Sequence, residues 1–98
     1  MPRKTKQINI TLLMRYLKPW MRETLKTLAE IDTPITTGEL LDKLLEKNIE
    51  ITHSQLLHYL KRLERHHIVK KYKLGYYRKL AWTLTDEIKK QIKQQPQT

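Results

Sequence analysis

The residues of this sequence that are best suited to chemistry lie in one stretch, residues 52–85, which reads THSQLLHYLKRLERHHIVKKYKLGYYRKLAWTLT. Residues 52–79 contain eight lysines and arginines and one acidic residue, Glu64, which gives this part a charge of +7. Ammonium and guanidinium groups bind phosphates, and the hydroxyl, amide and imidazole groups among them form hydrogen bonds. The pattern therefore indicates binding to a polyanion.

Motifs of catalysis and of metal binding are absent from the sequence. It has no glycine-rich phosphate loop, no Ser-x-x-Lys, no HExxH and no paired carboxylates in an apolar setting, so we expect neither an enzyme nor a cofactor. His53 and His58 would point to different sides of a helix, and the adjacent His66 and His67 diverge, so we expect no metal site. His58 is instead a candidate hydrogen-bonding residue, while His66 and His67 suit a helix C-terminus, where the dipole favours positive charge.

Charge is concentrated in two places. The net charge is +10 over 98 residues, and residues 1–6 contribute +3 while residues 52–79 contribute +7, so these two stretches supply the whole excess. A basic stripe on an otherwise balanced protein favours a polyanionic partner.

Length and composition indicate one small intracellular domain. A chain of 98 residues that is 39% hydrophobic can bury a single modest core but cannot enclose a roomy enzyme cleft. It has no cysteine, which excludes disulfides and thiolate metal sites, and its longest apolar run, Leu12 to Met14, is too short for a membrane span or a signal peptide. We expect a soluble protein of the cytoplasm.

The N-terminal part of the sequence predicts two helices followed by a short strand. Residues 1–8 should form a disordered basic arm, and residues 9–17 a short helix that stops before Pro19. A second helix should start at Pro19 and run to Ile31, where Asp32 to Pro34 punctuates its end. Residues 34–36 can then form a short strand.

Two capping boxes predict the next two helices. Thr36 with Glu39 opens a helix that ends near Asn48, and Thr52 with Gln55 opens one over residues 52–66. In the second of these helices three leucines recur on one face, and a polar, cationic set lies on the opposite face: Ser54, Gln55, His58, Lys61, Arg62 and Arg65. A helix with such an outward face fits a major groove.

After His67 the pattern alternates. Two strands joined by a turn at Gly75 predict a basic hairpin, or wing, over residues 69–80, and Trp82 should pack in the core. Thr85 can cap a final short helix, after which residues 94–98 form a disordered tail.

The order of these elements resembles the small winged helix-turn-helix transcription regulators of the MarR, ArsR and PadR types. The resemblance covers residues 19–93 and rests on TTGELLDKLL, on HSQLLHYLKRLERHHIVKK and on AWTLT before the last helix. His66 and His67 stand where those families usually carry a glycine. The resemblance implies a mainly α fold with a small β-hairpin (α+β), in which residues 9–93 form one DNA-binding domain.

The resemblance also implies a function, which is sequence-specific binding of double-stranded DNA by a nucleoid-associated transcription regulator. The helix 52–66 would lie in the major groove, with these residues near base edges: His53, Ser54, Gln55, His58 and Arg62. The wing and its surroundings would hold phosphates through Thr52, Lys61, Arg65, Lys70, Lys71, Lys73, Tyr76, Arg78 and Lys79. No effector motif is recognisable.

Such regulators usually pair through helices outside the core, so we expect a homodimer. The candidate interface residues are apolar and lie in the first and last helices: Ile10, Leu13, Tyr16, Leu17, Trp20, Ile88 and Ile92. The alternative is that the N-terminal segment folds back onto its own domain.

Two other functions remain open. The chain could be an assembly module of a replication or transcription complex, with a basic surface that makes non-specific nucleic-acid contacts. Gln55 and Tyr59, with Trp82, also faintly resemble the residues by which winged helices that bind Z-form nucleic acid stack on the backbone.

Overall fold

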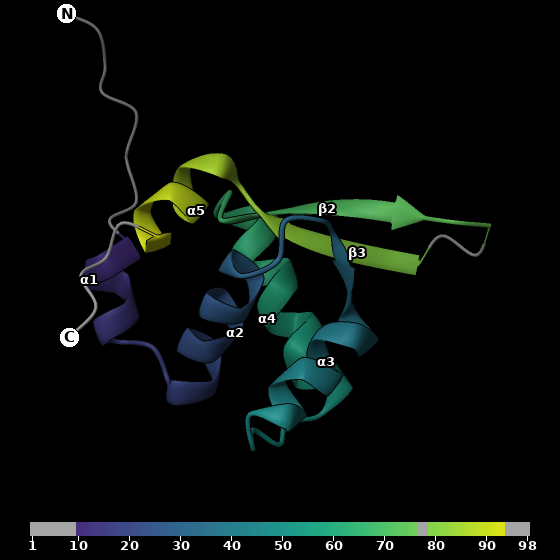
Figure 1. The fold of residues 1–98 in the computed structure, drawn as a ribbon, viewed down its shortest axis with the longest axis horizontal. Coiled ribbons are helices and arrows are strands. Elements are labelled where there is room, and N and C mark those ends of the chain that lie inside the picture. Colours follow the sequence, from purple (N-terminus) through teal and green to yellow (C-terminus); the bar gives the residue numbers. More distant parts are fainter. Residues whose placement is uncertain (1–9, 77–78, 94–98) are drawn as a thin grey trace, which may run out of the picture.

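The computed structural model describes residues 10–76 and 79–93. Its elements follow one another along the chain as α1 (Ile10–Arg15), α2 (Pro19–Ala29), β1 (Ile35–Thr36), α3 (Thr37–Glu46), α4 (His53–Arg65), β2 (Val69–Leu74), β3 (Lys79–Leu84) and α5 (Asp86–Lys93) (Figure 1). This order confirms the predicted α+β arrangement. The predicted arm, the predicted tail, Tyr77 and Arg78 lie outside the described residues. None of the helices described is long and apolar enough to cross a bilayer.

The core lies where α2, α3 and α4 meet, beneath the sheet (Figure 1). Most of the leucines at helical spacing are buried: Leu25, Leu28, Leu40, Leu44, Leu56, Leu60 and Leu63. On the apolar face expected in α3, Leu41 is only half-buried and Leu45 is 54% exposed. Trp82 of β3 is fully buried among them, and its indole Nε1 donates a hydrogen bond of 2.8 Å to Oγ1 of Thr37. That bond satisfies the one polar atom of the largest core side chain.

The sheet is antiparallel, with the strand order β1-β3-β2. β2 and β3 form the predicted wing, and Gly75 lies beyond the end of β2 with a φ of 71°, the left-handed conformation that glycine adopts without strain. Val69 pairs with Leu84 and Lys71 with Trp82. Because cross-strand partners lie on the same face, this register directs the apolar residues of β3 toward the helices.

Both predicted capping boxes are present. In α3 the Thr36 hydroxyl accepts from the backbone N–H of Glu39, and in α4 the Thr52 hydroxyl accepts from that of Gln55 at 3.0 Å. The caps fix where each helix begins, because they satisfy N–H groups that have no partner within the helix.

The two helices also end alike. The N–H of Ile49 donates to Leu44 and that of Ile68 to Leu63, which are the long bonds of a Schellman motif. Asn48, which precedes Ile49, and His67, which precedes Ile68, adopt the left-handed conformation with φ values of 64° and 60°. His67 therefore takes a conformation that a glycine would adopt more readily.

α1 folds back onto the domain, which was the alternative to its use in a dimer. It packs on α5, and the backbone N–H of Ile10 donates to Oε1 of Gln91 at 3.0 Å. Ile10 and Ile88, both predicted at the dimer interface, are 0% and 3% exposed and belong to the core of the single chain. At the start of α5 the Thr85 carbonyl accepts from Lys89, as at an N-cap, while the Thr85 hydroxyl donates back to the His67 carbonyl at 3.1 Å.

Candidate nucleic-acid interface

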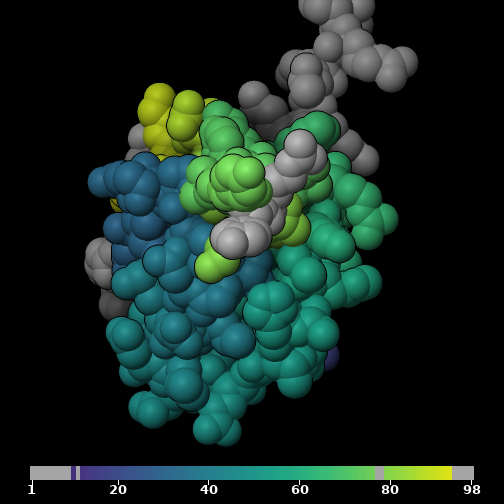
Figure 2. All heavy atoms as spheres, turned by 90° about the vertical axis from the view of Figure 1, so that its right-hand side faces the viewer, coloured from purple at the N-terminus to yellow at the C-terminus, as the bar shows by residue number. Residues whose placement is uncertain are grey.

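The outward side of α4 is the centre of the candidate site. The inward side is fixed by burial of Leu56, Leu60 and Leu63, so the residues half a turn away must face solvent. We call these exposed residues the recognition face: Ser54, His58, Lys61, Arg62 and Arg65. In Figure 2 the wing faces the viewer, with the surfaces of α3 and α4 below it. α4 and β2 of the wing also contact each other, and Lys71 of β2 pairs with Glu64 of α4.

A hollow of about 410 Å³ lies beside the recognition face, between α4 and the first turn of α2. We call it the Trp20 hollow, and its lining residues are Trp20, Met21, Ser54, Gln55, His58, Tyr59 and Arg62. It brings together four of the five residues predicted to read bases. The fifth, His53, lies elsewhere.

His53 lines a second hollow, of about 350 Å³, between the start of α3 and β3. We call it the Gly38 hollow, and it is lined by Thr36, Thr37, Gly38, His53, Leu57, Lys79 and Leu80. At its rim the hydrogen bonds from Thr36, together with the charges of Lys79 and Lys43, hold the pKa of Glu39 below its usual value. Lys79, predicted to contact phosphate, thus lies near an anion of its own chain.

Gln55 has a structural task in addition to its predicted one. Its side-chain Oε1 accepts a hydrogen bond of 2.9 Å from the Thr52 backbone N–H. Reading an adenine requires both the oxygen and the nitrogen of a glutamine amide. While the capping box is closed, one lone pair of the Gln55 oxygen is occupied, so the amide NH2 is the group that remains fully available to a base.

The cations of the wing are divided between its two faces. Lys71 and Lys73 pair with Trp82 and Leu80 and so lie on the face of the sheet that covers the helices, whereas Lys70 pairs with Thr83 on the opposite face. Lys71 also forms an ion pair of 3.6 Å with Glu64 of α4, the one anion in the basic stretch. This pair ties the wing to the recognition helix and lowers the charge that Lys71 can offer to a phosphate.

The aromatic residues near the wing differ in exposure. Tyr76, predicted to contact phosphate, is 98% exposed beside Gly75, and Tyr72 is 41% exposed on β2. Tyr59 and Trp82 are buried, and the Tyr59 hydroxyl donates to the Met21 carbonyl at 3.1 Å. Burial also raises the pKa of Tyr59. Burial of these two rings does not support the faint resemblance to Z-form binders, in which such rings stack on the backbone.

Trp20 and Met21 are the site residues that the sequence analysis missed. Trp20, a candidate dimer-interface residue, has its ring edge-on to Tyr59 of α4, with centroids 5.1 Å apart and planes at 74°. The signal that could have found it is positional: Pro19 starts α2, so Trp20 and Met21 occupy the turn that meets the recognition helix.

The histidines do not gather. In the part of the chain that the structure describes, no three His, Asp or Glu side chains are placed to hold a metal ion.

Three packed helices, with the third exposed on its outer side and followed by a β-hairpin, define the winged helix-turn-helix class. Solved structures of that class match this chain. MepR, a transcription regulator of the Staphylococcus aureus multidrug efflux pump MepA, superposes with a TM-score of 0.65 at 19% identity, over 87% of this chain and 59% of its own. A PadR family transcriptional regulator from Eggerthella lenta gives a TM-score of 0.59 at 18% identity, over 86% and 75% of the two chains.

A third structure, disulfide-formed AbfR, is 27% identical with a TM-score of 0.65, over 87% of this chain and 55% of its own. No protein-family model matches the sequence, and no curated protein matches it significantly. The chain spans only 59% of MepR and 55% of AbfR in length. These likenesses confirm the predicted fold, and MepR and the Eggerthella protein are regulators rather than enzymes.

Proposed function

We propose that this chain is a sequence-specific double-stranded DNA-binding protein that regulates transcription, with α4 in the major groove and the wing on the DNA backbone. One observation carries the proposal. Six exposed cations of α4 and the wing form no ion pair within the described residues: Lys61, Arg62, Arg65, Lys70, Lys73 and Lys79. Unpaired like charges repel one another, and a polyanion bound across them removes that repulsion.

The residues divide into two roles. Ser54, His58 and Arg62 project from the exposed side of α4 next to the Trp20 hollow, where base edges in a major groove would lie, with His53 and Gln55 at the helix start. The remaining cations, with Thr52, Tyr76 and Arg78, would hold phosphates, which set register and much of the affinity but carry no base code. Fold likeness to MepR and to the Eggerthella protein, both transcription regulators, supports a role in regulation.

The first test is selection of bound duplexes from a random library, followed by a salt titration on the selected duplex. A sharp motif is expected. If the six unpaired cations reach phosphates, the logarithm of affinity should fall against that of salt with a slope of about −5 per bound chain. Flat enrichment would contradict sequence-specific binding and favour the assembly module. A slope shallower than about −2 would show that these cations do not face the backbone.

We also propose that the chain forms a homodimer through the side of the α1 segment that remains exposed after it folds back onto α5. Leu12 on α1 and Tyr16, directly after its end, are 49% and 81% exposed, whereas Leu13 and Leu17 pack partly against the core. A second copy covering Leu12 and Tyr16 would remove that apolar surface from water. Tyr16→Glu should therefore yield a folded monomer by light scattering, with circular dichroism as the folding control. A wild-type protein that is monomeric at tens of micromolar would contradict the dimer.

A further inference from the structure

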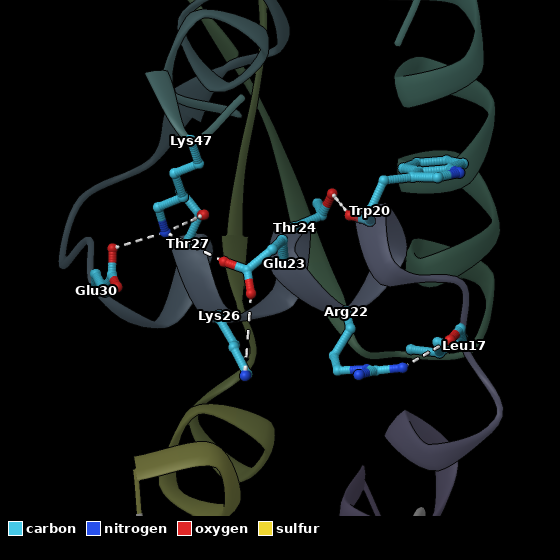
Figure 3. Close-up of polar contacts among 9 residues, drawn as sticks. All are labelled: Leu17, Trp20, Arg22, Glu23, Thr24, Lys26, Thr27, Glu30 and Lys47. Carbon is cyan, nitrogen blue, oxygen red and sulfur yellow. Dashed lines mark hydrogen bonds and ion pairs between the residues drawn. The ribbon is translucent and has the colours of Figure 1, made fainter. Parts of the chain in front are cut away.

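The Trp20 hollow combines two chemistries on one surface. One wall carries the polar groups Ser54, His58 and Arg62 of the recognition face, and the other is formed by the apolar side chains of Trp20 and Met21 with the ring of Tyr59. Trp20 is only partly buried, so its ring is accessible to a ligand that approaches α4. In Figure 3 this ring points away from the polar contacts of α2 and toward the neighbouring helix.

The apolar wall is held in place by contacts that are independent of any ligand. The Thr24 hydroxyl donates to the Trp20 carbonyl at 2.8 Å, and the Tyr59 hydroxyl donates to the Met21 carbonyl at 3.1 Å. The edge-on contact of Trp20 with Tyr59 fixes the ring against α4. Because the wall is formed before binding, contact with it costs little ordering of side chains.

Among the base edges that a major groove presents, one matches this pair of walls. Thymine carries an apolar 5-methyl group next to the O4 acceptor, whereas cytosine has no methyl group and the purines show only polar atoms there. A methyl group needs an apolar contact, and O4 needs a donor such as the Arg62 guanidinium or the His58 imidazole.

We propose that the Trp20 hollow receives the 5-methyl edge of a thymine in the bound DNA, so that Trp20 and Met21 are specificity residues supplied from outside the recognition helix. This inference rests on the proposed function, since it requires α4 to lie in a major groove. It also assigns Trp20 to the DNA surface and not to the dimer interface that the sequence suggested.

The test removes the methyl group alone. Each thymine of the selected duplex is replaced singly by deoxyuridine, which keeps O4 and base pairing. Loss of one buried methyl group should weaken binding about three- to fivefold at one thymine per half-site. Trp20→Ala and Met21→Ala should each bind the thymine and uracil duplexes nearly equally. Because both duplexes are compared on the same variant, any loss of folded protein cancels.

Tyr76→Ala is the matched control. It removes an exposed aromatic side chain from the wing, away from the Trp20 hollow. It should weaken binding to both duplexes by the same factor and leave the preference for thymine unchanged. An equal loss of that preference in Tyr76→Ala would show that the preference does not come from the Trp20 hollow.

Fluorescence gives an independent measurement. The chain has two tryptophans, and Trp82 is fully buried with its indole N–H bonded to Thr37. Adding the selected duplex should change the emission of the wild type but not that of Trp20→Phe, which retains only Trp82. If the emission changes with protein concentration but not on addition of DNA, Trp20 lies at a dimer interface and the inference is overturned.

The outcomes separate the two proposals. If no duplex is selected, the proposed function fails and the thymine contact fails with it. If a sharp motif is selected but no thymine-to-uracil change weakens binding, or the motif contains no thymine, only the thymine contact is overturned.

Discussion

Two surfaces of this molecule carry lysines, and the lysines differ in whether they form ion pairs. On the side of α2 and α3, the Lys47 ammonium donates to the Thr27 hydroxyl at 2.8 Å and forms ion pairs with Glu30 at 3.4 Å and Glu23 at 3.6 Å (Figure 3). Lys89 of α5 likewise donates to the Ile31 carbonyl at 3.1 Å and to Asp32 at 2.7 Å. We call these residues the paired surface.

The recognition face and the wing have the opposite arrangement. There one ion pair, Lys71 with Glu64, is found among the described residues. Lys79 lies near Glu39 without forming an ion pair with it, and the other described cations have no anionic partner. On the paired surface a lysine joins one helix to its neighbour, so its charge contributes to the fold. On the recognition face the described cations form no such link between helices, so their charges are available to an anionic partner.

The largest expected effect separates base reading from phosphate binding on the recognition face. Arg62→Ala should lower affinity for the selected duplex by about tenfold to a hundredfold, because a good contact to a base edge discriminates by about 1–3 kcal/mol, and it should affect unrelated DNA much less. Lys73→Ala should weaken binding to both duplexes alike and reduce the salt slope by about one unit. Indistinguishable behaviour of the two variants in binding titrations would show that α4 does not read bases.

The paired surface should respond in stability and not in binding. Lys47→Met removes the donor to Thr27, whose side chain is 1% exposed and is left with an unsatisfied hydroxyl, so unfolding free energy should fall by about 1 kcal/mol. Urea denaturation measures this loss, and DNA affinity of the folded variant should not change. Lys61→Met is the matched control on the recognition face, expected to weaken DNA binding at unchanged stability. The reverse pattern would contradict the division into two surfaces.

A smaller effect is expected where the recognition helix joins the wing. His67 adopts a left-handed conformation that costs a non-glycine residue about 1–2 kcal/mol, and a glycine avoids this cost. Part of that gain in stability is offset because glycine has more conformational entropy in the unfolded state. His67→Gly should therefore raise the unfolding free energy by about 0.5 kcal/mol in urea titrations. Asn48→Gly, at the equivalent end of α3, should change it less, because asparagine tolerates this conformation. A destabilised His67→Gly would mean that the imidazole makes a contact worth more than the strain.

The sequence predicted what depends on local patterns. Thr36 with Glu39 and Thr52 with Gln55 fix the starts of α3 and α4 through bonds that span three residues, and buried leucines follow the helical period. Contacts between segments that are distant in the sequence have no local sequence pattern from which they could be predicted. The pairing of Lys71 on β2 with Glu64 on α4 depends on how separate elements pack together. The same is true of the placement of Trp20 against α4 and of the burial of Ile10 beside α5.

The smallest expected effect concerns an exposed pair on the paired surface, where pH can remove one partner. The hydrogen bond from Lys89, with the charges of Lys89 and Lys93, holds the pKa of Asp32 below its usual value. A carboxylate whose folded-state pKa is lowered contributes stability that is present above its unfolded pKa, about 3.9, and is lost as the pH falls through the folded value. Asp32→Asn should therefore be slightly less stable than the wild type at pH 7, and the difference should vanish in acid. The effect is small because Asp32 is exposed and solvent screens the pair.

Asp42→Asn on α3, with no ion pair among the described residues, is the control and should remain close to the wild type at both pH values. A deficit of Asp32→Asn that persists at low pH would show that the link between α5 and α2 depends on packing and not on the charge of Asp32.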